Sequence, residues 1–316
     1  MSQPQADLSL ALSAGARRPL GAAGQYRSWG QRMAAHPLAL ASAGVLVLLA
    51  VLVLAEPLFA QAMDTDSAAQ DLLNRMQGPS AAHPLGTDDL GRDLLLRLLE
   101  GGRVSIGIGL VVAVGAAVIG TAVGLLAGYF GGVIDALLMR ITDGIIALPK
   151  LPLLIVLAAV DVTKLGLPAD WAQSPMLSFW RIAAIIALVG WTTAARLVRG
   201  ATLSVREREF VRAAVALGAR PPRVMFVHIL PNVMGPIVVS TTLSVGGIIL
   251  LESVLSFLGL GIQPPMASWG NMLTNAQDLI WSAPALAVWP GLMIFVTVIC
   301  CNFLGDGLQD ALDPRA

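Results

Sequence analysis

Residues 104–134 form an apolar run in which no side chain carries a charge. About 20 such residues let an α-helix cross the hydrocarbon core of a bilayer, because each residue adds about 1.5 Å. Backbone groups inside a bilayer must bond to one another, which favours a helix over irregular chain. The run therefore predicts a helix embedded in a membrane.

The composition of the whole chain agrees with a membrane setting. Charged residues make up 13% of the 316 residues, apolar residues make up 56%, and the mean hydropathy is +0.76. Soluble domains carry about 25% charged residues, so a soluble core could not hide this much apolar surface. The net charge of zero and the aromatic content of 5% give no sign of nucleic-acid binding.

Five further apolar segments predict an all-α integral membrane protein with about six transmembrane helices. The third segment is the weakest, because Asp143, Pro149, Lys150 and Pro152 interrupt it. Prolines are tolerated in membrane helices that have neighbours, so we expect one helix bent near Pro149. The six spans are predicted at 38–55, within 104–134, and at 136–160, 177–199, 231–252 and 283–304.

Residues 253–277 lie between the last two predicted spans and carry no charge, but they are rich in proline and glycine. Such breakers make a straight helix unfavourable, so we expect a loop, which could dip into the membrane. A seventh span here would move the C-terminus to the other side. In the last span, the neighbouring Cys300 and Cys301 read as small apolar residues rather than as a disulfide or a metal site.

The distribution of arginine and lysine predicts the orientation, because cytosolic loops carry more of them. Residues 1–35 read as a cytosolic and disordered tail rather than a secretory signal, because the apolar run that follows is too long for one. Both termini are expected in the cytosol, and Lys150 is left unassigned. The cytosolic segments then hold thirteen arginines (Arg17, Arg18, Arg27, Arg32, Arg140, Arg196, Arg199, Arg206, Arg208, Arg212, Arg220, Arg223 and Arg315), against six outer basic residues (Arg75, Arg92, Arg97, Arg103, Lys164 and Arg181).

Residues 206–232 contain a charged start, an alanine-rich stretch, Gly218, two prolines at 221 and 222, and Pro231 before the next span. This pattern predicts a short helix outside the membrane, a turn, and re-entry into the membrane. A rigid helix displayed in this way could fit a cleft in a soluble partner. The alternative is an ordinary basic loop that only fixes the topology.

The same segment resembles the signature cytosolic loop of bacterial ABC importer permeases. In that family two alanines are followed by a glycine four residues after the second, and Ala213, Ala214 and Gly218 match. Arg212 stands where an acidic residue is usual, although basic residues occur there in the peptide-permease branch. The resemblance implies a coupling helix that sits in a groove of the nucleotide-binding subunit. The residues that it assigns to coupling are Glu209, Arg212, Ala213, Ala214, Gly218, Ala219, Pro231 and Asn232.

Three further motifs resemble the dipeptide, oligopeptide and nickel branch of this family, closest to its C-type permease. They lie at 83–105, 255–270 and 304–315, and the resemblance covers about residues 36–316. Without the resemblance, the first would read as a turn capped by Thr87 or Asp88 that leads into an amphipathic helix. The outer-segment residues that it singles out are Gly86, Thr87, Asp88, Gly91, Arg92 and Asp93.

The resemblance implies a type I importer permease in the bacterial inner membrane that moves peptides into the cytoplasm. Its parts would be the tail 1–35, a first span with an outer loop at 36–103, and a core at 104–316 with five spans and a cytosolic coupling loop at 200–231. Its partners would be a second, different permease, two ATP-binding subunits, a binding protein outside and the bilayer. ATP and Mg²⁺ would be bound by the ATPase subunits, with no cofactor in this chain. The two lysines, Lys150 and Lys164, complete no phosphate-binding loop.

Several residues inside or near the predicted spans leave alternatives open. Gly120, Gly124, Gly128 and Gly132 recur every four residues and form a stripe suited to close helix packing, with a pore-lining surface as the alternative. Lys150 could pair with Asp143, extend to the membrane interface, or line the pathway and attract a carboxylate. Glu252 is expected near the outer surface, where its charge costs little.

Two other functions are alternatives to the permease. An ion-gradient-driven secondary transporter would need a buried acid near the middle of the membrane, for which Asp143 and Glu252 are the candidates. A membrane-embedded enzyme would need a catalytic cluster, and the sequence gives no sign of one. His36, His83 and His228 are scattered, without a second ligand at metal spacing.

Overall fold

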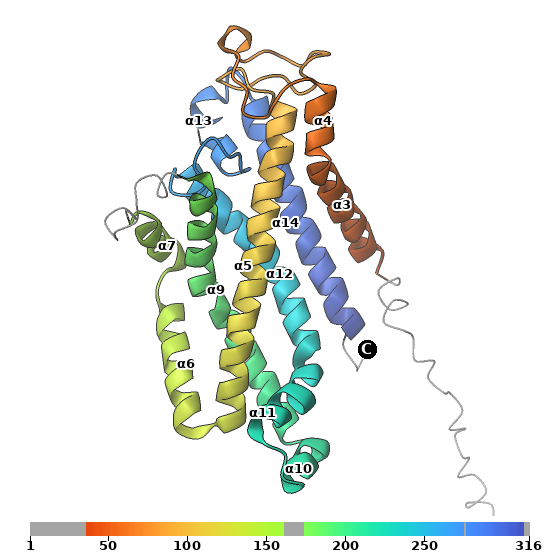
Figure 1. Ribbon diagram of the computed structural model, residues 1–316, viewed down its shortest axis with the longest axis vertical. Helices are drawn as coiled ribbons and strands as arrows, with labels where there is room; N and C mark the ends of the chain where they lie inside the picture. The colour runs from red at the N-terminus through yellow and green to blue at the C-terminus, as the bar shows by residue number, and fades with distance from the viewer. Residues whose placement is uncertain (1–35, 161–173, 275, 313–316) are drawn as a thin grey trace, which may run out of the picture.

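The structure is a computed structural model that describes residues 36–160, 174–274 and 276–312, and these residues are helical apart from loops, turns and one isolated bridge. Figure 1 shows an elongated bundle with α10 at one end and the loops before α5 at the other. The predicted tail 1–35, the motif residues 313–315 and Lys164 lie outside the described residues. The prediction of an all-α membrane protein is confirmed.

Five described helices are long and apolar enough to cross a membrane, and a sixth span is reached if the bent pair of α6 and α7 counts as one. This agrees with the predicted number. The long helices are α3 (Pro37–Leu54), α5 (Leu94–Phe130), α9 (Pro175–Arg206), α12 (Leu230–Phe257) and α14 (Ala285–Leu312), and the bent pair is α6 (Gly132–Ala147) with α7 (Lys150–Ala158). The short elements are α4 (Glu56–Ala62), η1 (Leu72–Asn74), α10 (Glu209–Ala216), α11 (Pro221–Arg223), η3 (Val224–Ile229), η4 (Asn271–Leu273) and α13 (Ala276–Leu279).

Helix α5 is much longer than the predicted second span. Its 37 residues join the predicted amphipathic helix and the span into one rod, and its N-cap is Asp93 rather than Thr87 or Asp88. The helix runs unbroken through Gly101 and Gly102, and the indole of Trp269 packs so close that an added Cβ would lie 3.3 Å from it at Gly101 and 2.9 Å at Gly102. The Trp269 Nε1 also donates to the Leu98 carbonyl at 2.9 Å.

Helices α5 and α9 pack along the glycine stripe. A Cβ added at Gly120 would lie 2.6 Å from the Trp191 carbonyl oxygen, and one at Gly124 would lie 2.6 Å from the Ala195 carbonyl oxygen. The packing interpretation is therefore confirmed, and Gly128 continues it against Thr202 on α9. Gly132 was wrongly included, because α5 ends before it and it is the first residue of α6.

The predicted position of the bend near Pro149 is confirmed, but the prediction of one bent helix was wrong, because two separate helices, α6 and α7, meet there at 86°. The residue before a proline is driven out of the helical region, and Leu148 accordingly has an extended ψ of 138°. Pro149 then serves as the N-cap of α7. Pro152 lies in the first turn of α7, where a missing N–H costs no helical hydrogen bond.

Residues 253–257 complete α12, so the predicted loop begins later than expected, and its described part contains η4 and the start of α13. It is packed into the bundle, with Trp269, Ala267 and Ser268 all buried. Trp269 belongs to the main apolar core with Ile108 of α5. Cys300 and Cys301 are buried free thiols within α14, as expected for small apolar residues.

Glu252 is buried completely, and the expectation of a partly exposed, low-cost position was wrong. Its Oε2 accepts from the Ser105 hydroxyl at 3.0 Å and its Oε1 accepts from the Ser256 hydroxyl at 2.6 Å. Ser105 in turn accepts from the Trp269 backbone N–H at 3.2 Å. The folded loop after α12 covers this end of the helix, which is why a position near the helix end is not a solvated one.

Candidate functional site: the coupling segment and the outer polar cluster

The coupling segment, residues 207–220, begins where α9 ends, so it is shorter than the predicted loop at 200–231. Arg206 is the last residue of α9, and its Nη1 donates to the carbonyls of Gly128 at 3.2 Å and Tyr129 at 2.9 Å. These carbonyls belong to the last turn of α5, which has no partners within its own helix and favours a nearby cation. The start of the coupling segment is therefore fixed to the end of α5.

Helix α10 is the predicted short helix and stands at one end of the bundle (Figure 1). Only Val211 is buried in it, at 1% exposure, and it joins an apolar cluster with Val224, Ile229 and Val233 below α12. The predicted coupling residues Glu209, Arg212 and Ala213 are exposed, and Ala214 is half-buried. One anchored residue thus holds a helix whose remaining surface is open.

The sequence did not predict that large apolar side chains are exposed on this open surface. Phe210 is 42% exposed, Val215 is 50% exposed and Leu217 is 89% exposed. Large apolar residues gathered at an exposed tip indicate a contact surface for another protein. Their position within an otherwise charged segment was the available signal.

Gly218 and Ala219 close α10 with two backbone hydrogen bonds. The Gly218 N–H donates to the Val215 carbonyl at 2.9 Å and the Ala219 N–H donates to the Ala214 carbonyl at 3.0 Å. This is the Schellman arrangement, which needs a left-handed residue after the helix. Gly218 supplies it with a φ of +84°. The family spacing of two alanines and a glycine is therefore the geometry of one helix end.

The prediction that Pro231 opens the fifth span was wrong. The helical path is continuous from Pro221 through α11, η3 and α12 to Phe257. A π-helical turn, η3, ends at Ile229, two residues before Pro231, whose missing N–H disturbs regular helical bonding. Asn232 follows and donates from its amide to the His228 carbonyl at 2.8 Å. Pro231 and Asn232 thus shape the re-entry and lie apart from α10.

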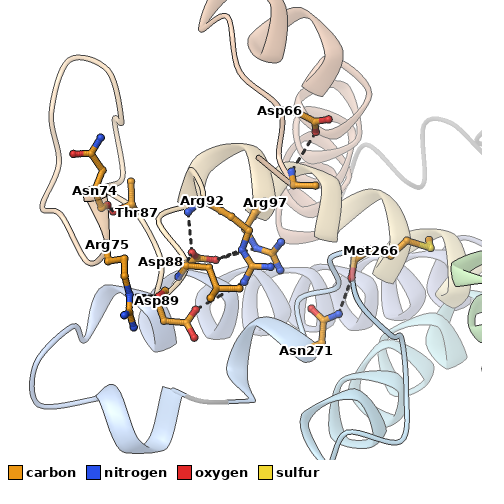
Figure 2. Close-up of polar contacts among 12 residues, drawn as sticks. Asp66, Asn74, Arg75, Thr87, Asp88, Asp89, Arg92, Arg97, Met266 and Asn271 are labelled. Carbon is orange, nitrogen blue, oxygen red and sulfur yellow. Dashed lines mark hydrogen bonds and ion pairs between the residues drawn. The ribbon is translucent and has the colours of Figure 1, made fainter. Parts of the chain in front are cut away.

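The outer polar cluster consists of His83, Thr87, Asp88, Arg92, Asp93 and Arg97, most of which are labelled in Figure 2. Asp88 Oδ2 binds the Arg92 Nε at 2.7 Å and the Arg97 Nε at 3.4 Å. Its other oxygen accepts from the backbone N–H groups of Leu90 and Arg92, both at 2.9 Å. Asp88 is therefore saturated by its own loop and by Arg97 of α5.

Asp93 and Thr87 complete the cluster. Asp93 Oδ1 caps α5 by accepting from the Leu96 N–H at 2.9 Å, while Oδ2 lies 2.9 Å from His83 Nδ1. Thr87 Oγ1 accepts from the Gln77 N–H at 2.9 Å and donates to the Asn74 carbonyl. These contacts tie the outer loop to the first turn of α5.

Gly86 and Gly91 allow the outer loop to fold back on itself. Gly91 has a φ of +74°, and an added Cβ would collide with the Asp71 carbonyl oxygen. An added Cβ at Gly86 would likewise collide with the Gln77 carbonyl oxygen. The motif residues of the outer segment therefore build the loop, while the individual contacts of His83 and Arg97 could not be predicted from sequence spacing.

A cavity of about 530 Å³ lies beside the outer polar cluster. Asp88, Asp89 and Arg97 line one side, and Gln263 and Asn271 from the loop after α12 line another. Figure 2 shows Asn271 opposite Arg97, with its amide turned to the Met266 carbonyl. The Arg97 Nη1 is buried and has no hydrogen-bond partner among the described residues.

The fold and these two ends define a multi-pass membrane permease. The chain belongs to the family described as the binding-protein-dependent transport system inner membrane component, whose sequence profile matches residues 120–316. It is a permease subunit of an ABC importer in the inner membrane, and such importers work with an ATPase and a substrate-binding protein. Membership of this family favours the ABC permease over the ion-driven transporter and the membrane-embedded enzyme.

Named relatives resemble most of the chain. It is 42% identical to the dipeptide transport system permease protein DppC of Alkalihalophilus pseudofirmus, over 87% of this chain and 86% of that protein. It is 38% identical to the glutathione transport system permease protein GsiD of Pectobacterium atrosepticum, over 92% and 91%. It is 37% identical to the oligopeptide transport system permease protein OppC of Bacillus subtilis, over 90% and 88%.

Proposed function

We propose that this permease moves short peptides into the cytoplasm and that α10 couples it to the ATPase. The peptide class is supported by the printed names of the relatives, which are dipeptide, glutathione and oligopeptide permeases. The coupling role rests on one observation. A helix held by the buried Val211 presents Phe210, Val215 and Leu217 to the outside at one end of the bundle.

The coupling step follows from how α10 is mounted. Arg206 fixes the start of the coupling segment to α5, and Val211 fixes α10 beneath α12. A partner that binds α10 more tightly in one arrangement of these helices shifts the permease toward that arrangement. ATP binding by the partner then favours one side of the membrane over the other.

The complex would contain a second, different permease, two ATP-binding subunits and an external binding protein. ATP and Mg²⁺ would be bound by the ATPase subunits, with no cofactor in this chain, because neither lysine completes a phosphate-binding loop. Both termini would lie in the cytosol with α10, as the arginine distribution favours. The coupling residues would be Glu209, Arg212, Ala213, Ala214, Gly218 and Ala219, with Pro231 and Asn232 shaping the re-entry.

Mild solubilisation of the tagged complex tests this proposal. The expected result is co-purification of a second permease and of ATPase subunits in near-equal amounts. Leu217→Asp should reduce the co-purified ATPase at least fivefold, because a charge would have to be buried in the contact. Leu73→Asp is the matched control, since Leu73 is 94% exposed at the opposite end of the bundle.

Two outcomes would count against the proposal. Equal ATPase recovery with Leu217→Asp and Leu73→Asp would remove the role of α10. A purified wild-type complex in proteoliposomes that hydrolyses ATP but takes up none of a mixed set of labelled di-, tri- and oligopeptides would remove the peptide class.

A further inference from the structure

A second cavity, of about 460 Å³, lies among α5, α7, α9 and α12. Its walls are mostly apolar, with Ala113, Ile186 and Leu251 from three of these helices. Four hydroxyl side chains and a single ionisable residue also line it. They are Thr193, Ser240, Thr241, Ser244 and Lys150.

Lys150 is the only charged residue in the lining of this cavity. It is exposed at the first position of α7, where the sharp bend after α6 places it beside the bundle. The pair with Asp143, one of three alternatives for Lys150, does not form, because Asp143 binds Arg196 at 2.6 Å instead. Within the described parts of the chain, no carboxylate forms an ion pair with Lys150.

The hydroxyl groups of the cavity are placed to accept hydrogen bonds. Thr241 donates its hydroxyl proton to the Ile237 carbonyl at 2.7 Å, and Ser244 donates to the Ser240 carbonyl at 2.8 Å. Ser240 likewise donates to the Ile237 carbonyl, at 3.0 Å. A hydroxyl whose proton is held by its own helix still has an oxygen that can accept from an N–H group.

A cation in a membrane segment is costly unless it faces protein, water or a ligand of opposite charge. A peptide offers the complementary set of groups, because it carries amide N–H donors, apolar side chains and one terminal carboxylate. The lining offers hydroxyl acceptors, apolar walls and one ammonium group. The long, mobile lysine side chain can follow a moving carboxylate without fixing its geometry.

We propose that this cavity is the part of the translocation path contributed by this chain, and that Lys150 attracts the terminal carboxylate of the peptide as it passes. Lys150 then determines specificity for peptides with a free carboxylate over those whose C-terminus is an uncharged amide. This inference rests on the proposed peptide transport function and adds a substrate feature and a residue to it.

The test is uptake into proteoliposomes that hold the complete complex, with its binding protein at saturating concentration. The probes are two peptides that differ only in a free or an amidated C-terminus, chosen so that the purified binding protein binds both. For Lys150→Gln, the ratio of acid to amide uptake should fall about tenfold, equivalent to about 1.4 kcal/mol. Lys150→Arg should restore the ratio, and Arg140→Gln, which removes a charge from α6 outside the cavity, should leave it unchanged.

A second measurement tests the position of Lys150 without relying on uptake. In a Cys300→Ala, Cys301→Ala background, Lys150→Cys should react with a small charged thiol reagent in the assembled complex. Peptide together with the binding protein and ATP should slow this reaction at least threefold. No protection would overturn the assignment of the cavity to the path.

The outcomes distinguish a failure of the role of Lys150 from a failure of the proposed peptide transport function. If the wild-type complex transports neither peptide, the proposed peptide function fails. If both peptides are transported and Lys150→Gln leaves their ratio unchanged, only the role of Lys150 fails. If Lys150→Gln lowers both rates equally and weakens assembly of the two permeases, Lys150 pairs with the second permease and the inference is wrong.

Discussion

Arg199 on α9 and Asp135 on α6 form a two-point ion pair, with Nε to Oδ1 at 2.5 Å and Nη2 to Oδ2 at 2.6 Å. Helix α6 has one buried residue, Thr142, so apolar packing contributes little to its attachment. The Arg196 to Asp143 pair, at 2.6 Å, lies along the same two helices. Two charge pairs therefore add to the limited apolar contact between α6 and the bundle.

We expect Arg199→Lys to lower the stability of the purified permease by about 0.5–1 kcal/mol, because an ammonium cannot reproduce the two parallel bonds. The loss is small because both side chains are partly exposed. Thermal unfolding in detergent would measure it. In a double-mutant cycle, Arg199→Ala and Asp135→Ala together should cost less than the sum of the single changes, and strict additivity would argue against the pair.

Gly124→Ala should destabilise the α5 and α9 contact by about 1–3 kcal/mol, since the new methyl group would press on the Ala195 carbonyl and the Val198 side chain. Gly115→Ala is the matched control on the same helix, because nothing lies within 4 Å of its added Cβ. Melting temperatures of the two variants should differ clearly. Similar values would show that the glycine stripe is not a packing surface.

Gly218→Val should cut transport about tenfold or more while leaving membrane insertion intact. A β-branched residue with a φ near +84° is strained by about 1–3 kcal/mol, so the end of α10 would rearrange. Uptake and membrane abundance should be measured together. Gly200→Ala, at an open position inside α9, should transport normally, and normal uptake by Gly218→Val would contradict the coupling role of this helix end.

Glu252→Ala should destabilise the outer half of the bundle by about 2–4 kcal/mol, because it leaves the hydroxyls of Ser105 and Ser256 without their buried acceptor and opens a cavity. Ser105→Ala should lower the stability less, by about 1–2 kcal/mol, since it removes only one of the hydroxyl donors to Glu252. Thermal unfolding would rank the two variants. The reverse order would show that Glu252 is not the centre of this network.

The sequence predicted the number of spans and the bend near Pro149, because apolar length and proline act locally. It did not predict that α5 continues through Gly101 and Gly102. That continuation depends on Trp269, which lies more than 160 residues further along the chain and packs against both glycines. Glu252 was misjudged for the same reason, since its burial comes from a loop and from Ser105 on another helix.

The sequence predicted the coupling segment better than it predicted the outer polar cluster. The helix end at Ala214 and Gly218 is a local motif, so sequence spacing was enough to place it. The outer motif was placed correctly but its contacts were not, because His83 and Asp93 meet only after the loop folds back. The partner of Asp143 could not be read from spacing either, since Arg196 comes from a different helix.

Helix α9 runs without interruption from the loop after α12 to the coupling segment. Near one end Arg181 contacts the Leu260 carbonyl at 3.4 Å, and at the other Arg206 contacts the Tyr129 carbonyl at 2.9 Å. Three glycines of α5 pack closely against it between these ends. Under the coupling role proposed for α10, this close-packed helix pair would carry a tilt imposed at α10 to the loop after α12, which contacts the outer end of α9.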